Sequence, residues 1–138
     1  KQLNNLHITI ETKIECDDKL AISSTQLNQI LTNLLFNARD SIMESNNSNK
    51  TIIIESSRIN SNCLISIQDT GTGFSPAKLE RPFEAFKTSK KRGQGTGLGL
   101  WIIKRILDEI RGKINIQNCE IGAKVEIIIP LFLEKQND

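Results

Sequence analysis

Apolar residues recur at intervals of three and four positions between about residues 24 and 44, the period of one face of an α-helix. Ser23 or Ser24 precedes this stretch and offers a side-chain oxygen to cap the helix. We therefore predict a long amphipathic helix whose inward positions are Leu27, Ile30, Leu31, Leu34, Ala38 and Ile42.

Strands are predicted where apolar and polar residues alternate or where β-branched residues cluster between turn residues. Leu6, Ile8 and Ile10 predict a half-buried strand, and Leu20 and Ile22 a second short one. Residues 51–55 and 63–67 predict a hairpin, and two closing strands are predicted at 113–119 and 124–129.

A second helix is predicted at about 98–111, where Ile102, Ile103, Ile106 and Ile110 face inward and Gly112 ends the helix. The segment between Asp69 and Gly99 holds six of the eight glycines and two of the three prolines. Such a long connection is usually functional or mobile. The elements together predict an α+β domain, with a mixed or antiparallel sheet covered by helices on one face.

Composition narrows the possible classes of protein. The 138 residues suit one domain, and the net charge of +2 favours neither a nucleic-acid partner nor direct membrane contact. The five Phe, one Trp and absence of Tyr make base-stacking platforms improbable. The three distant cysteines fit neither a zinc site nor a disulfide framework, so a reducing compartment is expected.

The run Gly95-Thr96-Gly97-Leu98-Gly99-Leu100 stands directly before the second predicted helix. Glycine lets the backbone approach a bulky anion, and a helix N-terminus offers unpaired N–H groups and partial positive charge. The run predicts a phosphate-binding turn. The alternative is a flexible loop before a helix.

Asn33 and Asn37 lie four residues apart, so both amides belong to one face of the first helix. An amide oxygen together with a triphosphate and water would suit Mg²⁺. The alternative is two solvated amides on a surface helix.

Two further clusters carry candidate chemistry. Asp69-Thr70-Gly71-Thr72-Gly73-Phe74 ends a predicted strand, where a carboxylate can accept a hydrogen bond from an exocyclic amine such as that of adenine. The alternative is an Asp that caps its own turn. Phe83 and Phe86 suggest a short helix pinned by two rings, and Lys90 could reach a terminal phosphate; the alternative there is a mobile basic loop.

In this order and spacing, the four clusters resemble the ATP-binding catalytic domain of sensor histidine kinases, within the GHKL superfamily of kinases and ATPases. Residues 33–41 look like the N box in its nitrogen-regulation-type form, 69–74 like the first glycine box, 83–90 like the F box and 95–100 like the second glycine box. The resemblance covers nearly the whole chain, 1–138, including its closing strands.

The resemblance implies a Bergerat-type two-layer α/β sandwich that binds ATP and Mg²⁺, with a mobile ATP lid at about 75–96. Asn37 would ligate Mg²⁺, Asp69 would hold the adenine amine, and Asn33 and Lys90 would be catalytic. Nucleotide contacts would come from Asn33, Asn37, Asp69, Gly71, Gly73, Thr88, Gly95, Gly97, Leu98 and Gly99.

Several positions depart from the family pattern. Ala85, Lys87 and Ser89 replace the usual Pro, aromatic and Thr of the F box, and Asp40 stands where many relatives carry Lys. Related ATPases carry Glu where this chain has Asn33. An amide cannot act as a general base near neutral pH, which argues for phosphate transfer over hydrolysis.

The implied function is transfer of the γ-phosphate of ATP to a histidine on a separate dimerisation domain. His7 lies on a predicted strand, unlike the family's helical acceptor, and is not expected to accept phosphate. A degenerate nucleotide-binding module and a GHKL ATPase are the alternatives. Expected partners are ATP or ADP, that phosphoacceptor domain and a cognate response regulator. The domain is expected to be a cytoplasmic monomer within a homodimeric protein, itself either cytoplasmic or anchored in the inner membrane.

Overall fold

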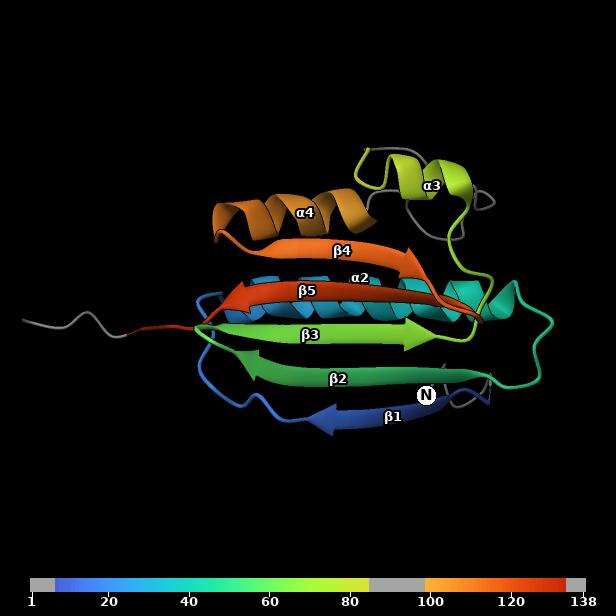
Figure 1. Cartoon of the computed structure of the whole chain (residues 1–138), viewed down its shortest axis with the longest axis horizontal. Helices are drawn as coiled ribbons and strands as arrows, with labels where there is room; N and C mark the ends of the chain where they lie inside the picture. Colours follow the sequence, from blue (N-terminus) through green and yellow to red (C-terminus); the bar gives the residue numbers. More distant parts are fainter. Residues whose placement is uncertain (1–6, 85–98, 134–138) are drawn as a thin grey trace, which may run out of the picture.

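The computed structural model describes residues 7–84 and 99–133, which form a sheet with helices on one face (Figure 1). The helices and strands follow one another as β1 (Thr9–Ile14), α2 (Ser24–Met43), β2 (Thr51–Ile59), β3 (Asn62–Asp69), α3 (Pro76–Glu80), α4 (Gly99–Glu109), β4 (Lys113–Asn118) and β5 (Ala123–Pro130). The predicted α+β class and two-layer sandwich are confirmed.

The sheet has five strands in the order β1-β2-β3-β5-β4. β1 pairs with β2 in parallel, whereas the other neighbours pair antiparallel, so the sheet is mixed. β3 lies at the centre, and its last residue, Asp69, pairs with Ile52 at the start of β2. This register puts the polar turn that follows β3 at one end of the sheet.

The predicted first helix is confirmed as α2. Its N-cap is Ser23, whose Oγ accepts the backbone N–H of Gln26 at 3.1 Å, while the Gln26 side chain accepts the N–H of Ser23. Ile30, Leu34 and Ile42 on its inner face are at most 2% exposed, and burial of each such side chain contributes about 1.5–3 kcal/mol.

α4 confirms the second predicted helix, but its end is built differently from the prediction. Arg111 adopts the left-handed conformation at φ 61°, and the N–H of Gly112 donates to the Leu107 carbonyl at 2.7 Å. Gly112 is instead suited to close approach, because a Cβ there would lie 2.6 Å from the Ile128 carbonyl oxygen. Leu107 is fully buried and adds to the predicted isoleucines.

Two strand predictions at the N-terminal side were wrong. The first strand runs from Thr9 to Ile14 instead of from Leu6 to Ile10, and all of its residues are exposed because it is an edge strand. Ile10 is 41% exposed, although Ile8 just before the strand is buried. Leu20 makes only an isolated bridge with Leu131, so no second short strand forms there.

Candidate functional site

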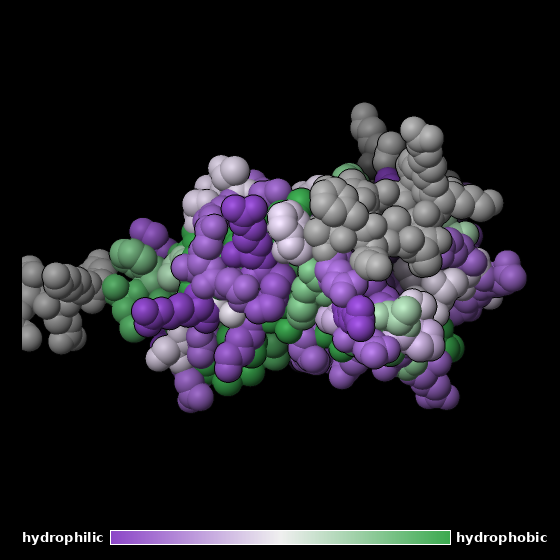
Figure 2. Space-filling model, turned by 90° about the horizontal axis from the view of Figure 1, so that it is seen from above, coloured by the Kyte–Doolittle hydropathy of each residue, from purple (hydrophilic) through white to green (hydrophobic). Residues whose placement is uncertain are grey.

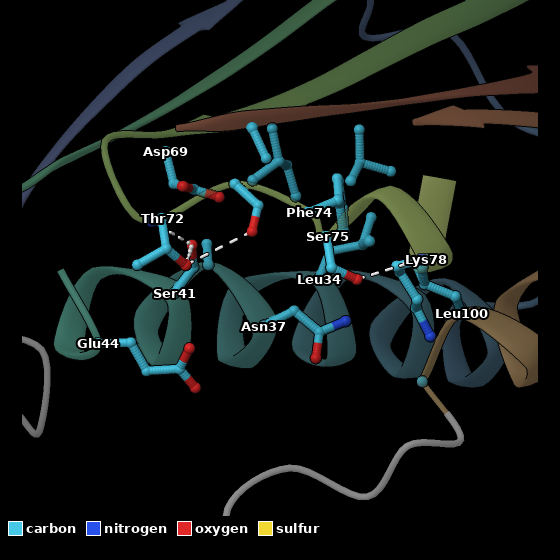
Figure 3. Close-up of a pocket in the computed structure, with 16 residues that line it drawn as sticks. Leu34, Asn37, Ser41, Glu44, Asp69, Thr72, Phe74, Ser75, Lys78 and Leu100 are labelled. Atoms are coloured by element: carbon cyan, nitrogen blue, oxygen red, sulfur yellow. Dashed lines mark hydrogen bonds between the residues drawn. The ribbon is translucent and has the colours of Figure 1, made fainter. Parts of the chain in front are cut away.

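A cavity of about 120 Å³ opens between α2, the turn after β3, α3 and the first residues of α4 (Figure 3). Its apolar wall comes from both layers of the sandwich and consists of Leu34, Ala38, Ile67, Phe74, Leu100, Ala123 and Val125. Its polar wall consists of Asn37, Ser41, Glu44, Asp69, Thr72, Ser75 and Lys78, with Gly73 and Gly99 contributing backbone. An apolar slot with polar groups at its rim suits a flat ring with a polar tail.

Asp69 forms one end of this cavity. The side chain is 7% exposed, and its Oδ1 accepts the backbone N–H of Gly71 at 2.8 Å. The sequence suggested either a turn-capping Asp or a ligand-binding Asp, and this residue caps its turn while also lining the cavity.

The turn after β3 is fixed against α2. The N–H of Thr72 donates to Ser41 Oγ at 3.0 Å and lies 3.2 Å from the Ser41 carbonyl oxygen. A Cβ on Gly71 would overlap Ser41, so glycine is required there for close packing of turn and helix. Gly71 therefore packs against α2 outside the cavity wall, whereas Gly73 is part of that wall.

The turn between β4 and β5 supports the same end of the cavity. Gly122 has φ +80°, and a Cβ there would overlap the backbone oxygen of Asp69. Asn118 binds both backbone groups of Phe74: its Oδ1 accepts the N–H at 2.7 Å and its Nδ2 donates to the carbonyl at 2.9 Å. Asp69 is thus positioned by a backbone contact with Gly122, and Phe74 by the Asn118 side chain.

Asn37 lies on α2 beside the N-terminus of α4. An added Cβ on Gly99 would be 3.2 Å from Asn37 Nδ2, so backbone and amide are close together. Asn37, Asp69, Gly73 and Gly99 of the predicted site are thus brought to one cavity. Asn33, one turn earlier on α2, is half-buried and is not among the residues of the cavity wall.

Arg39, the basic residue two positions after Asn37 on α2, is paired with a residue outside the cavity wall. Arg39 forms an ion pair with the buried Asp40 at 3.0 Å, and its guanidinium lies 4.8 Å from the centre of the Phe36 ring. Among the described residues, the cationic side chain on the cavity wall is Lys78 of α3.

Lys78, Glu44 and Asn118 were not predicted as parts of the site. The pair Ser75-Pro76 could have revealed α3, because Ser75 Oγ accepts the Lys78 N–H at 3.2 Å and proline suits the first helical position. No local pattern points to Asn118, whose partner Phe74 is 44 residues away in sequence.

Five predicted site residues lie outside the described residues, namely Thr88, Lys90, Gly95, Gly97 and Leu98. Most of the predicted lid segment lies there too. His7, which was predicted to lie on a strand, is instead exposed in a turn two residues before the start of β1, with φ 56°.

The side chains of residues 7–84 and 99–133 show whether the protein alone could hold a metal ion. No group of three or more His, Cys, Asp or Glu side chains is placed to hold a metal ion in those ranges. The amide oxygen of Asn37 is the kind of single hard ligand with which Mg²⁺ is bound when phosphate and water complete its shell. The residues present fit a metal that arrives with a nucleotide.

The outer surface of α4 differs from the cavity. Arg105, Asp108 and Glu109 are exposed there, and Figure 2, which looks onto this side, shows mainly hydrophilic residues. In the part of the chain that the structure describes, no helix has the length and apolar character needed to cross a membrane.

Comparison with known proteins identifies what this chain is similar to. Residues 22–133 match the family described as histidine kinase-, DNA gyrase B-, and HSP90-like ATPase. A Rickettsia bellii protein named as an NtrY-like sensor histidine kinase is 36% identical over 122 residues, covering 88% of this chain and 19% of that protein. The chain spans about a fifth of the length of the curated relatives it matches.

Solved structures agree in fold. The catalytic domain of the histidine kinase ThkA, in a nucleotide-free form, aligns with a TM-score of 0.79 and 30% identity over 94% of this chain and 83% of that one. Full-length ShkA in complex with AMPPNP aligns with a TM-score of 0.77 and 25% identity, over 94% of this chain and 27% of that one.

Proposed function

Because this chain belongs to the histidine kinase-, DNA gyrase B- and HSP90-like ATPase family, we propose that it is the ATP-binding catalytic domain of a sensor histidine kinase. The whole of 1–138 is one such domain, with the ATP lid at about 75–96. It binds Mg–ATP in the described cavity and donates the γ-phosphate to a histidine on a separate dimerisation domain.

The proposal rests on one observation: the Asp69 carboxylate and the Asn37 amide line the same cavity. Asp69 presents a buried, oriented carboxylate, and Asn37 lies against the N-terminus of α4. A carboxylate suits the exocyclic amine of adenine, whereas an amide oxygen beside a helix N-terminus suits Mg²⁺ and phosphate. A nucleotide presents those two chemistries at its two ends.

The remaining contacts are assigned by family membership. Asn37 would ligate Mg²⁺, which neutralises charge on the phosphates. Gly71 and Gly73 shape the adenine pocket. The other nucleotide contacts are assigned to Asn33, Thr88, Gly95, Gly97, Leu98 and Gly99, and Lys90 contacts the terminal phosphate as a point charge.

Transfer to an acceptor is favoured over hydrolysis by the residue four positions before Asn37. In the transfer, the bond from the γ-phosphorus to the β,γ-bridging oxygen breaks and a bond to the acceptor imidazole nitrogen forms, while that imidazole loses a proton. Asn33 has no basic group that could instead activate water. Its amide is assigned to the phosphates as a catalytic contact.

The proposed partners follow from the same assignment. They are the phosphoacceptor domain of the same protein and a cognate response regulator. We place the domain in the cytoplasm as a monomer, inside a protein that dimerises through its phosphoacceptor domain.

The test combines calorimetry and a phosphate-release assay on this chain. We expect Mg-dependent ATP binding in the micromolar to millimolar range, about 8 to 4 kcal/mol, with negligible phosphate release. The Asn33→Glu variant, which restores the carboxylate of related ATPases, should bind ATP and release phosphate slowly. Steady phosphate release from the parent would assign an ATPase. Nucleotide binding without transfer to a supplied phosphoacceptor domain would assign a degenerate module, and absence of nucleotide binding would overturn the proposal.

A further inference from the structure

Lys78 differs from the rest of its helix. The other four residues of α3, Pro76, Ala77, Leu79 and Glu80, are exposed, whereas Lys78 is half-buried and lines the cavity. In Figure 3 its side chain lies at the same end of the cavity as Leu100 of α4, and Asp69 lies at the opposite end. The helix therefore presents a cation to the cavity at the end away from the proposed adenine position.

The backbone that carries Lys78 is anchored by contacts among described residues. Ser75 Oγ caps α3 by accepting the Lys78 N–H, and the preceding residue, Phe74, is held at both backbone groups by Asn118. The backbone therefore fixes the position of Lys78 on the cavity wall.

A triphosphate ligand would need a cationic side chain on the cavity wall, because the charged groups there include two carboxylates. The described wall contains the carboxylates Asp69 and Glu44, and Arg39 is paired with Asp40 away from the wall. A triphosphate brings several negative charges, and the N-terminus of α4 supplies only a partial positive charge. A lysine in a partly enclosed cavity adds a full charge and up to three donors.

We propose that Lys78 binds the phosphate chain of the nucleotide and sets the preference of this site for ATP and ADP over AMP. This inference rests on the proposed function, because it assumes that adenine lies at Asp69. It adds a cation from the segment directly after the first glycine box, a segment in which the sequence analysis had predicted no phosphate contact.

The test compares Lys78→Gln with Lys104→Gln, a matched control. Lys104 carries the same charge, is part-exposed on α4 and pairs with Asp108, away from the cavity. Mg–ATP affinity is measured by calorimetry and AMP affinity by chemical-shift titration. Lys78→Gln should weaken ATP binding about tenfold and AMP binding less than twofold, whereas Lys104→Gln should change neither.

The salt dependence gives a second readout. Raising the ionic strength should weaken ATP binding to the parent more steeply than to Lys78→Gln, because one screened charge pair has been removed. Lys78→Arg should keep most of the ATP preference.

The outcomes separate the two proposals. Unchanged ATP affinity in Lys78→Gln, with ATP binding lost in Asp69→Asn, would overturn this inference and leave the proposed function standing. Equal weakening of ATP and AMP would also overturn it, because the lysine would then act through the shape of the cavity. A parent chain that binds neither nucleotide would overturn both.

Discussion

The two ends of the cavity are built in different ways. At the Asp69 end, backbone segments lie in near-touching positions, as at Gly71 on Ser41 and Gly122 on Asp69, and the side chains of Ser41 and Asn118 bind neighbouring backbone groups. At the Asn37 end, side chains and a helix terminus from α2, α3 and α4 converge across open space. An alanine in place of a glycine should therefore affect folding at the first end and ligand binding at the second end.

The largest effect is expected for Gly122→Ala at the Asp69 end. A Cβ there overlaps the Asp69 backbone oxygen, and φ +80° is unfavourable for alanine. Urea unfolding should show a loss of about 2–4 kcal/mol in the free energy of unfolding. A Gly122→Ala protein as stable as the parent would mean that the two turns are not in the contact described.

Asp69→Asn is expected to separate binding from folding at that same end. The amide oxygen can still accept the N–H of Gly71, so the turn should persist. The new amide donor would meet the adenine amine, itself a donor, and weaken ATP binding by about 1–3 kcal/mol, or about 5- to 150-fold. Calorimetry checks the affinity, and circular dichroism checks that the fold is kept. Parent-like ATP affinity would remove the adenine assignment.

Gly99→Ala probes the opposite end with the same type of substitution as Gly122→Ala. The added Cβ would lie 3.2 Å from Asn37 Nδ2, the end of a side chain that can move. The free energy of unfolding should change by less than about 1 kcal/mol, while Mg–ATP affinity falls several-fold because Asn37 is displaced. A loss of stability matching that of Gly122→Ala would show that both ends are equally rigid.

The sequence predicted the core and the Asn37 end of the cavity well. It did not predict the contacts from Asn118 and Gly122 that hold the Asp69 end. Helical period and a capping serine were enough for α2, whereas the proposal that Asn37, Asp69 and Gly99 meet needed the resemblance of the ordered motifs to a known family. These signals are local, or they belong to ordered motifs.

The support provided by Asn118 and Gly122 depends on the register of β4 and β5 against β3. That register joins residues about 50 apart in sequence, such as Asp69 and Gly122, and no local spacing encodes it. The edge strand β1 was misplaced for a related reason, because alternation predicts a buried face, whereas the helices leave Ile10 and Ile14 exposed.

The smallest effect on ATP binding is expected at Cys63, six residues before Asp69 on β3. Burial, and secondly the neighbouring Cys16, raise the pKa of the Cys63 thiol from 9.0 to about 12. The unfolded chain loses this proton first, so stability is full below pH 9 and falls as the pH rises from 9 towards 12.

Urea unfolding of the parent and Cys63→Ala between pH 8 and 10.5 measures that contribution. The parent should lose more stability with rising pH than the variant, while ATP affinity at pH 8 stays the same in both. Identical pH dependence would mean that Cys63 is not in the buried environment described.

The central claim is that the Asp69 carboxylate accepts a hydrogen bond from the exocyclic amine of adenine. The most direct test compares calorimetric titrations of the protein with Mg–ATP and with Mg–ITP. Inosine carries a carbonyl oxygen where adenine carries the amine, so a buried carboxylate would face a second acceptor. We predict that the parent chain binds ATP at least about tenfold more tightly than ITP. Equal affinity for the two nucleotides would contradict the account.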